Sequence, residues 1–282
     1  MAKAEPSDVL AAWETSSQYW NIHRTLIEQM FAPLTRVLIE DARVTVGQSV
    51  IDIGGGSGEP SLTVASLIGD SGRITYTDPS AGMVKAARDE AERRGLTNIR
   101  FHQCPAEQLP FPDNSFDVAL SRLSAMFFPD VLAGLREMLR VIRPDGVLSF
   151  VVWGARESNP FFLIVNEILD AFVPTDPEDV DAPHAFRFAR PGKLTKLLQD
   201  AGAVSLSERM QPFKIEAPMT ASRFWEFRTE MSDTFRSKLK TLELEKVLAV
   251  KEQVEKAASR YVLDGQMNFP AEVLVVTGSK PI

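Results

Sequence analysis

Apolar side chains recur three and four residues apart near both ends of the chain. Near the start the pattern is carried by Val9, Leu10, Trp13, Leu26, Met30, Phe31, Leu34 and Leu38. Near the end it is carried by Phe224, Phe227, Met231, Phe235, Leu239 and Leu242. This period places the apolar side chains on one face of a helix. It predicts a helical stretch over 7–43 and a long helix or helix pair from 220 to about 262.

Between these stretches, short runs of β-branched and apolar residues alternate with helical patterns. The runs predict strands at 49–53, 73–77, 99–104, 116–121 and 147–154. The intervening patterns predict helices at 59–69, where Pro60 falls in the first turn, and at 79–95 and 130–142. Pro144, Asp145 and Gly146 predict a turn before the fifth strand. Strands that alternate with helices indicate a mainly parallel sheet covered on both faces, hence a Rossmann-like, doubly wound α/β fold.

The pattern is less regular after residue 154. A helix at 191–202, a strand within 203–216 and an antiparallel last strand at 271–279 are predicted to complete the sheet. We divide the chain into an N-terminal helical cap (1–44), an α/β core (45–154), a lid excursion (155–190), a core helix and strand (191–219), a helical lid insertion (220–265) and a closing strand (266–282). The cap, excursion and insertion are expected to gather as a lid over the carboxyl edge of the sheet.

Composition and charge narrow the function classes. The 282 residues include 31 Lys+Arg and 38 Asp+Glu, for a net charge of −7, which disfavours a broad contact with nucleic acid or anionic membrane. Cys104 is the single cysteine and the Cys and His residues lack metal-ligand spacing, so we expect no metal. There is no apolar run near the ~18 residues of a membrane span, and we expect a cytoplasmic protein.

A glycine-rich loop follows the first strand. Gly54, Gly55, Gly56 and Gly58 occupy four of five positions. Glycines permit positive φ and let a ligand lie against bare main chain, and the following helix N-terminus suits a carboxylate or phosphate. Ligands of open α/β sheets bind at the carboxyl ends of the strands, so this loop is the first candidate site.

Asp78 ends the second strand, 20 residues after Gly58. A carboxylate there accepts both hydroxyls of a ribose in nucleotide-cofactor folds. The pair Asp78-Pro79 also has the pattern of a helix N-cap followed by proline at the first helical position. Both roles stay open.

The residues after the loop bear on which nucleotide is bound. The dinucleotide fingerprint needs a third glycine where Glu59 or Ser61 stands. A carboxylate at 59 disfavours a pyrophosphate and is better suited to a ligand with a sulfonium and an ammonium. This disfavours NAD.

Four motifs occur in an order that resembles a known family. They are VIDIGGGSGEPSL (50–62), YTDPSAGMVKAAR (76–88), AEQLPFPDNSFDVALSRLSAMFFPD (106–130) and LREMLRVIRPDGVLSFVVWG (135–154). Over about residues 45–154 the chain resembles the class I S-adenosylmethionine-dependent methyltransferases, in particular the group with the ubiquinone/menaquinone-biosynthesis methylases. The resemblance specifies the cofactor, S-adenosylmethionine, and leaves the substrate open.

The resemblance also implies roles for single residues. Gly54, Gly55 and Gly56 would line the methionine part of the cofactor. Asp52 would shape the turn, Asp78 would hold the ribose, and Pro79 and Met83 would flank the adenine. The cofactor-binding set is completed by Tyr19 near the carboxylate, Ala106 and Glu107 at the adenine, and Ser121 and Arg122 at the methionine end. Two positions depart from the family: Gly55 replaces a frequent cysteine, which we expect to be harmless, and Pro105 replaces the usual acidic adenine contact, for which Glu107 is the candidate substitute.

The expected function is methyl transfer to a small, partly apolar metabolite. His184 is the candidate general base, because its loop is where this fold places substrate contacts and its usual pKa suits neutral pH. Aromatic residues that could line an acceptor pocket are Trp13, Tyr19, Trp20, Phe127, Phe128, Phe161, Phe162, Phe186 and Phe188. The alternatives are an NAD(P)-dependent oxidoreductase and a non-catalytic S-adenosylmethionine-binding protein. The amphipathic stretch after 220 suits a homodimer contact as well as a lid, so the oligomeric state stays open.

Overall fold

The computed structural model describes residues 6–174 and 179–282, with side chains from Val9 onward. Residues 1–5 and 175–178, within the predicted cap and excursion, lie outside the described residues. The strands are β1 (Ser49–Ile53), β2 (Arg73–Asp78), β3 (Ile99–Gln103), β4 (Phe116–Arg122), β5 (Ile142–Trp153), β6 (Val204–Pro218), β7 (Val262–Leu263) and β8 (Gln266–Ser279). The helices are α1 (Pro6–Ile22), α2 (Arg24–Asp41), α3 (Ser61–Ile68), α4 (Ala81–Arg93), α5 (Val131–Val141), α6 (Pro160–Phe172), α7 (Lys193–Ala201), α8 (Ala221–Met231), α9 (Asp233–Leu239) and α10 (Leu244–Ala258).

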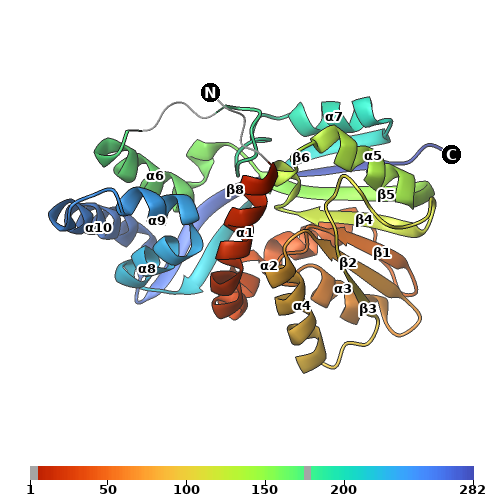
Figure 1. The fold of residues 1–282 in the computed structure, drawn as a ribbon, viewed down its shortest axis with the longest axis horizontal. Coiled ribbons are helices and arrows are strands. Elements are labelled where there is room, and N and C mark those ends of the chain that lie inside the picture. Colours follow the sequence, from red (N-terminus) through yellow and green to blue (C-terminus); the bar gives the residue numbers. More distant parts are fainter. Residues whose placement is uncertain (1–5, 175–178) are drawn as a thin grey trace.

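The described strands form one sheet in the order β3-β2-β1-β4-β5-β8-β6, with β7 pairing β8 (Figure 1). β1 to β5 pair in parallel, and β8 pairs antiparallel with β5 and β6. Nearly all side chains of β1 and β4 are buried, although successive side chains point to opposite faces. Both faces are therefore covered, and the predicted doubly wound fold with an antiparallel last strand is confirmed.

The helices cover the sheet in two groups. α5 packs against α7 and β5, and α7 packs against β6. α3 and α4 pack against β2 and β3. α2 packs against β4, β5, β6 and β8, with Met30, Leu34 and Leu38 almost fully buried. α2 thus covers a face of the sheet, whereas α1 contacts α4, α8 and α9. The predicted gathering of both N-terminal helices over the carboxyl edge is wrong for α2, since its apolar face requires the broad apolar surface of the sheet.

A second group of helices lies at one end of the molecule. Figure 1 shows α6, α8, α9 and α10 gathered around the ends of β6 and β8, with α1 between this group and the parallel strands. β6 and β8 are long, pairing from Val204 with Ser279 to Pro218 with Gln266, and so extend beyond the other strands. One hydrophobic core joins Ile51 of the parallel sheet to Phe161 and Phe224 of the helical end.

Two local predictions need correction. The predicted turn at 144–146 lies within β5, where the pairing with β4 shifts between Phe116 and Val118 and Asp145 takes a φ of 62°. Residues 143–146 therefore form an irregularity in the strand, because Phe116 still pairs with Ile142. Pro60 precedes α3 as its N-cap residue, one position before the expected first turn.

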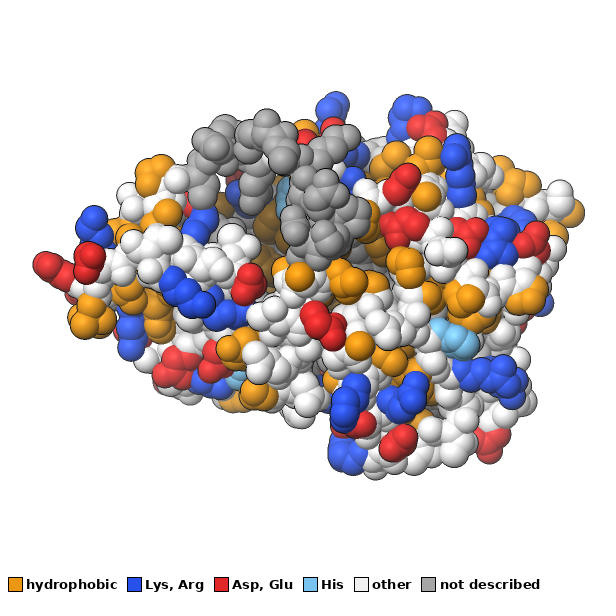
Figure 2. Space-filling model, in the orientation of Figure 1, with side chains coloured by type: hydrophobic (Ala, Val, Ile, Leu, Met, Phe, Trp, Pro, Cys, Tyr) orange, Lys and Arg blue, Asp and Glu red, His pale blue; other side chains and the backbone are white. Residues whose placement is uncertain are grey.

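On the face shown in Figure 2, Lys and Arg side chains are interspersed with Asp and Glu. None of the helices in the described ranges is long and apolar enough to cross a membrane.

Candidate functional site

The glycine loop is fixed by contacts with the neighbouring strands. The backbone N–H groups of Gly54 and Gly55 donate to the carbonyl oxygen of Thr77 in β2, at 2.9 and 3.0 Å. A Cβ on Gly54 would lie 2.6 Å from Ser124 Oγ, and one on Gly55 would lie 2.5 Å from Cε2 of Tyr76. Gly55 is therefore required by its packing against Tyr76. Glycine thus fits this position, and the expectation that it replaces the family's cysteine without harm stays a prediction.

Gly56 differs from its two neighbours. It takes a φ of 55°, and a Cβ built on it would meet no atom within 4 Å. Its N–H donates to Asp78 Oδ2 at 3.0 Å, while Tyr76 Oη donates to its carbonyl oxygen at 2.6 Å. The main chain at Gly56 is thus held rigidly and left bare toward open space, as a closely approaching ligand requires.

The Asp78 carboxylate lies beside this bare main chain at the end of β2. Its Oδ1 accepts from the N–H of Ser80 at 2.9 Å, and its side chain is only 8% exposed. Burial raises the pKa of Asp78 to about 6, against the opposing effect of the two backbone hydrogen bonds. Ser80 is the N-cap of α4, since its Oγ accepts from Met83 N at 3.1 Å. The predicted N-cap at Asp78 is therefore wrong, because the helix is capped two residues later, by Ser80. The Asp78 carboxylate faces the crevice instead.

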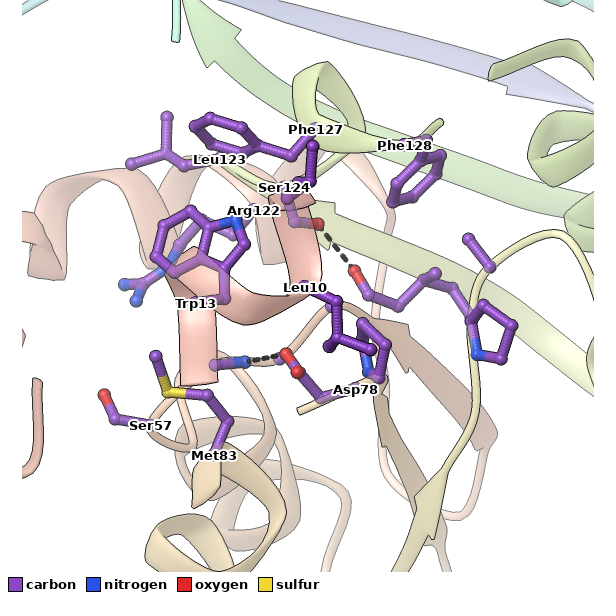
Figure 3. A pocket seen from close by; sticks show the side chains of 18 of the residues that line it. Leu10, Trp13, Ser57, Asp78, Met83, Arg122, Leu123, Ser124, Phe127 and Phe128 are labelled. Carbon is purple, nitrogen blue, oxygen red and sulfur yellow. Dashed lines mark hydrogen bonds between the residues drawn. The ribbon is translucent and has the colours of Figure 1, made fainter. Parts of the chain in front are cut away.

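A cavity of about 330 Å³ opens over this loop (Figure 3). Of the predicted cofactor-binding residues, those that line it are Gly54, Gly55, Gly56, Asp78, Pro79, Met83, Ala106, Glu107 and Arg122. Of the predicted aromatic candidates, those that line it are Trp13, Trp20, Phe127 and Phe128. Figure 3 shows Trp13 and Leu10 of α1 at this cavity together with Phe127 and Phe128, which follow β4. Five segments far apart in sequence thus meet at the carboxyl edge of the sheet.

Asp52 and Ser121 lie beneath the cavity wall. Asp52 is fully buried and its Oδ2 accepts from Ser61 Oγ at 2.7 Å. Burial raises the pKa of Asp52 to about 7. Ser121 Oγ is 2.7 Å from Ser124 Oγ, which donates to the carbonyl oxygen of Ile53. These two side chains therefore brace the loop at the ends of β1 and β4.

Tyr19 and His184 do not line the cavity. The Tyr19 ring faces Arg236 of α9, whose Cζ lies 4.6 Å from the ring centroid. His184 Nδ1 accepts from the N–H of Phe186 at 3.2 Å. Their roles as a carboxylate contact and a general base stay predictions. Glu107 does reach the cavity wall, although its Oε1 accepts from the N–H of Asp130 at 3.1 Å.

Sequence reasoning missed two residues that assemble the site. Arg24, at the start of α2, donates to the carbonyl oxygens of Ser57 and of Ala86, the latter at 2.7 Å. Glu14 of α1 accepts from Gly82 N at 3.0 Å and from Ser80 Oγ. Their partners lie 33 to 68 residues away, so local periodicity carries no signal for them.

Glu59 and Arg122 are charged residues of the cavity wall. Both line the cavity, and Arg122 Nη1 donates to Thr35 Oγ1 at 2.7 Å. Burial raises the pKa of Glu59, an effect that the positive charge of Arg122 opposes. The carboxylate that disfavours a pyrophosphate therefore does border the crevice, as its place after the glycine loop suggests.

Comparisons with known proteins agree with this geometry. Residues 51–150 match a family model described as a methyltransferase domain. The ubiquinone/menaquinone biosynthesis C-methyltransferase UbiE of Azotobacter vinelandii is 37% identical over 138 residues, covering 49% of this chain and 53% of that protein. This chain thus spans about half the length of that relative. An uncharacterized protein of Mycobacterium tuberculosis is 27% identical over 281 residues, covering 98% of this chain and 97% of its own.

The fold has solved counterparts. The YcgJ protein of Bacillus subtilis superimposes with a TM-score of 0.56 at 23% identity, over 88% of this chain and 98% of that one. Over residues 51–150 the predicted resemblance to the S-adenosylmethionine-dependent methyltransferases is confirmed. The chain contains, at residues 51–150, a class I S-adenosylmethionine-dependent methyltransferase domain related to the ubiquinone/menaquinone C-methyltransferases.

Proposed function

We propose that the protein transfers the methyl group of S-adenosylmethionine to a small, partly apolar metabolite. The observation that carries this proposal is the meeting of Gly56, the Asp78 carboxylate and an apolar wall at one cavity. The bare backbone at Gly56 matches the amino-acid chain of the cofactor, and the Asp78 carboxylate matches its ribose. The third matches an acceptor with apolar surface.

The residues present fit the cofactor. Asp78 has a second lone pair on each oxygen, so it can accept ribose hydroxyls while keeping its bonds to Gly56 and Ser80. Pro79 and Met83 offer apolar contact to the adenine, and the N–H of Ala106 offers it a donor. Arg122 supplies positive charge for a carboxylate and Glu59 negative charge for an ammonium.

The cofactor supplies an activated methyl group on a sulfonium. The protein's task is then to hold the acceptor in line with that methyl and to exclude water, which is worth up to ~7–11 kcal/mol in favourable cases. Trp13 of α1 and Phe127 after β4 pack edge to face, with centroids 5.0 Å apart, and narrow the cavity from two sides. A base is needed only if the acceptor loses a proton during attack. His184 remains our candidate for that case.

The partners we propose are limited to a small acceptor. The interspersed charges in Figure 2 support the absence of a nucleic-acid partner on that face. The cytoplasmic location and the homodimer stay predictions from composition and from the amphipathic stretch.

Cofactor binding is tested by calorimetry with S-adenosylhomocysteine. Asp78→Asn is expected to weaken binding by about 10- to 100-fold, because a hydrogen bond to a charged group contributes about 1.5–3 kcal/mol. Asp89→Asn, on the exposed side of α4, is the control and should bind like the wild type. Binding of NADH but not of S-adenosylhomocysteine would overturn the proposal.

Enzyme activity needs a separate measurement. Methyl transfer to a panel of small phenols, amines and acids is expected for at least one class. A protein that binds S-adenosylhomocysteine but transfers no methyl group to any of them is a binding protein and contradicts the proposed enzyme.

A further inference from the structure

Arg228 of α8 is a buried cation outside the cofactor cavity. Only 8% of the Arg228 surface is exposed to solvent. Within residues 6–174 and 179–282 no carboxylate pairs with it, and its Nε is enclosed without a hydrogen-bond acceptor. Arginines are almost never buried unless paired, because an enclosed charge without a partner costs several kcal/mol.

Aromatic rings surround the guanidinium. Its Cζ lies 4.9 Å from the ring centroid of Phe161 and 4.8 Å from that of Phe162, both at the start of α6. These cation–π contacts offset part of the lost hydration. They leave the buried Nε–H of the guanidinium without an acceptor, since a ring face is no substitute for a planar acceptor. Burial accordingly lowers the pKa of Arg228 to about 10.

Ring contacts connect Arg228 to the cofactor cavity. Phe31 lines the cavity and packs against Trp153 with centroids 5.9 Å apart. Trp153 in turn packs against Phe162 at 4.7 Å, which brings the series to Arg228. Trp153 is the last residue of β5, so the series passes the carboxyl edge of the sheet.

A second donor without a partner lies at the cofactor cavity. The Nε1 of Trp20 is buried and has no acceptor among the described residues, and its ring lines the cavity. Two enclosed N–H donors, one at the cavity and one at the other end of the aromatic series, indicate that an acceptor from outside the chain satisfies them.

We propose that Arg228 binds a carboxylate of the methyl acceptor, which is thereby a flat, apolar acid. This inference rests on the proposed function. A carboxylate matches the planar fork of a guanidinium with two parallel hydrogen bonds and balances its single charge. The apolar body of the acid lies along Phe162 and Trp153, and its nucleophilic end faces the cofactor cavity. Arg228 is a positioning and specificity residue, because it holds the end of the acceptor remote from the reacting atoms.

The test measures binding of 2-naphthoate and of its uncharged analogue 2-naphthamide to protein saturated with S-adenosylhomocysteine. Calorimetry should show that the wild type binds the acid at least 10-fold more tightly than the amide. Arg228→Met keeps the length and apolar contacts of the side chain. It should lose at least 10-fold in affinity for the acid and less than 3-fold for the amide, with cofactor affinity unchanged within 2-fold.

Arg223→Met is the matched control. Arg223 is on the same helix, but its side chain is exposed and its Nη1 pairs with Glu226 at 2.8 Å. This variant should keep the preference for the acid. If Arg228→Met does not fold, Arg228→Lys is used, and it should fall between wild type and no preference because it keeps the charge without the fork.

The outcomes separate the two proposals. Cofactor binding without any preference for the acid, an unchanged preference in the Arg228 variant, or no binding of either probe overturns the role of Arg228 alone. Failure to bind S-adenosylhomocysteine overturns the proposed function.

Discussion

At the residue scale, the protonation of Asp52 is the clearest physical consequence of the site. The carboxyl group is fully buried, receives one hydrogen bond from Ser61 and has an Oδ1 without a donor in the described part of the chain. Burial raises its pKa to about 7, and the nearby carboxylates of Glu59 and Asp78 act in the same direction. The folded protein therefore holds a proton here at pH values where the unfolded chain has lost it.

This shift makes stability depend on pH. Because the folded pKa of Asp52 is raised, its contribution is fully present below the unfolded value of 3.8 and is lost as pH rises through about 7. We expect the unfolding free energy of the wild type to fall between pH 5 and 7, and Asp52→Asn to remove roughly 2 kcal/mol of that fall. Urea unfolding at four pH values measures it. An equally steep fall in the variant would contradict the assignment.

Asp78 adds a pH dependence to ligand binding. Its pKa is raised to about 6, and the ionised form is the better acceptor for ribose hydroxyls. The affinity for S-adenosylhomocysteine should therefore rise about 5- to 10-fold from pH 5 to pH 7 and level off above it. Calorimetry across this range measures the profile. A pH-independent affinity would place the ribose elsewhere.

The residues of the site differ in how far the sequence revealed them. Gly56 and Asp78 belong to a motif of fixed spacing, so their meeting was predictable. The helix cap at Ser80 was not, because Asp, Pro and Ser stand together and only the backbone decides which one caps. The unpaired state of Arg228 depends on which helices pack around it, and no pattern within α8 carries that information.

At the scale of elements, α1 is held over the cofactor cavity by a few polar contacts. Glu14 binds the first turn of α4, and Val9, Leu10 and Trp13 of the same helix line the cavity. Just past its C-terminal end, His23 Nε2 lies 2.5 Å from Glu230 Oε2 of α8. α1 therefore connects the parallel sheet to the helical end of the molecule.

Breaking the contacts between α1 and α4 should make α1 close the cofactor cavity less tightly. Glu14→Ala removes both contacts with the start of α4, so we expect about 3- to 10-fold weaker binding of S-adenosylhomocysteine, mainly through faster dissociation. Stopped-flow kinetics measure this, and amide exchange in α1 should quicken. Glu92→Ala, exposed on α4, is the control. Unchanged dissociation would mean that α1 does not limit cofactor release.

The elements themselves were largely predictable, and their interruptions were not. Strong alternation between strand and helix patterns located β1 to β5 within a few residues. The single predicted stretch at 7–43 is two helices that meet at His23, and the stretch from 220 is three, with Ser232 capping α9. An apolar stripe keeps its period across such breaks, because each helix still buries the same face.

At the scale of the whole molecule, the long pairing of β6 with β8 joins two structural regions. One end of this pairing, at Val273–Ser279 of β8, joins β5 of the parallel sheet. α6 packs against β8, and α10 packs against both α6 and α8. Since one cluster of buried apolar residues contains both Leu34 of α2 and Val254 of α10, the helical end shares its core with the sheet in the described part of the chain. The boundaries predicted at 155 and 220 divide the sequence at changes of pattern, and they stay predictions as domain limits.

This continuity predicts how the protein unfolds. We expect one cooperative thermal transition, because the helical end loses its core when the sheet unfolds. S-adenosylhomocysteine at 100 times its Kd stabilises the folded state by about 2.7 kcal/mol, which corresponds to roughly 5 °C for a chain of this size. Calorimetric scans with and without the ligand measure both quantities, and NADH at the same concentration should leave the transition unmoved. Two transitions, of which the ligand moves only one, would show that the helical end is an independent domain, and that binding is not coupled to it through α1.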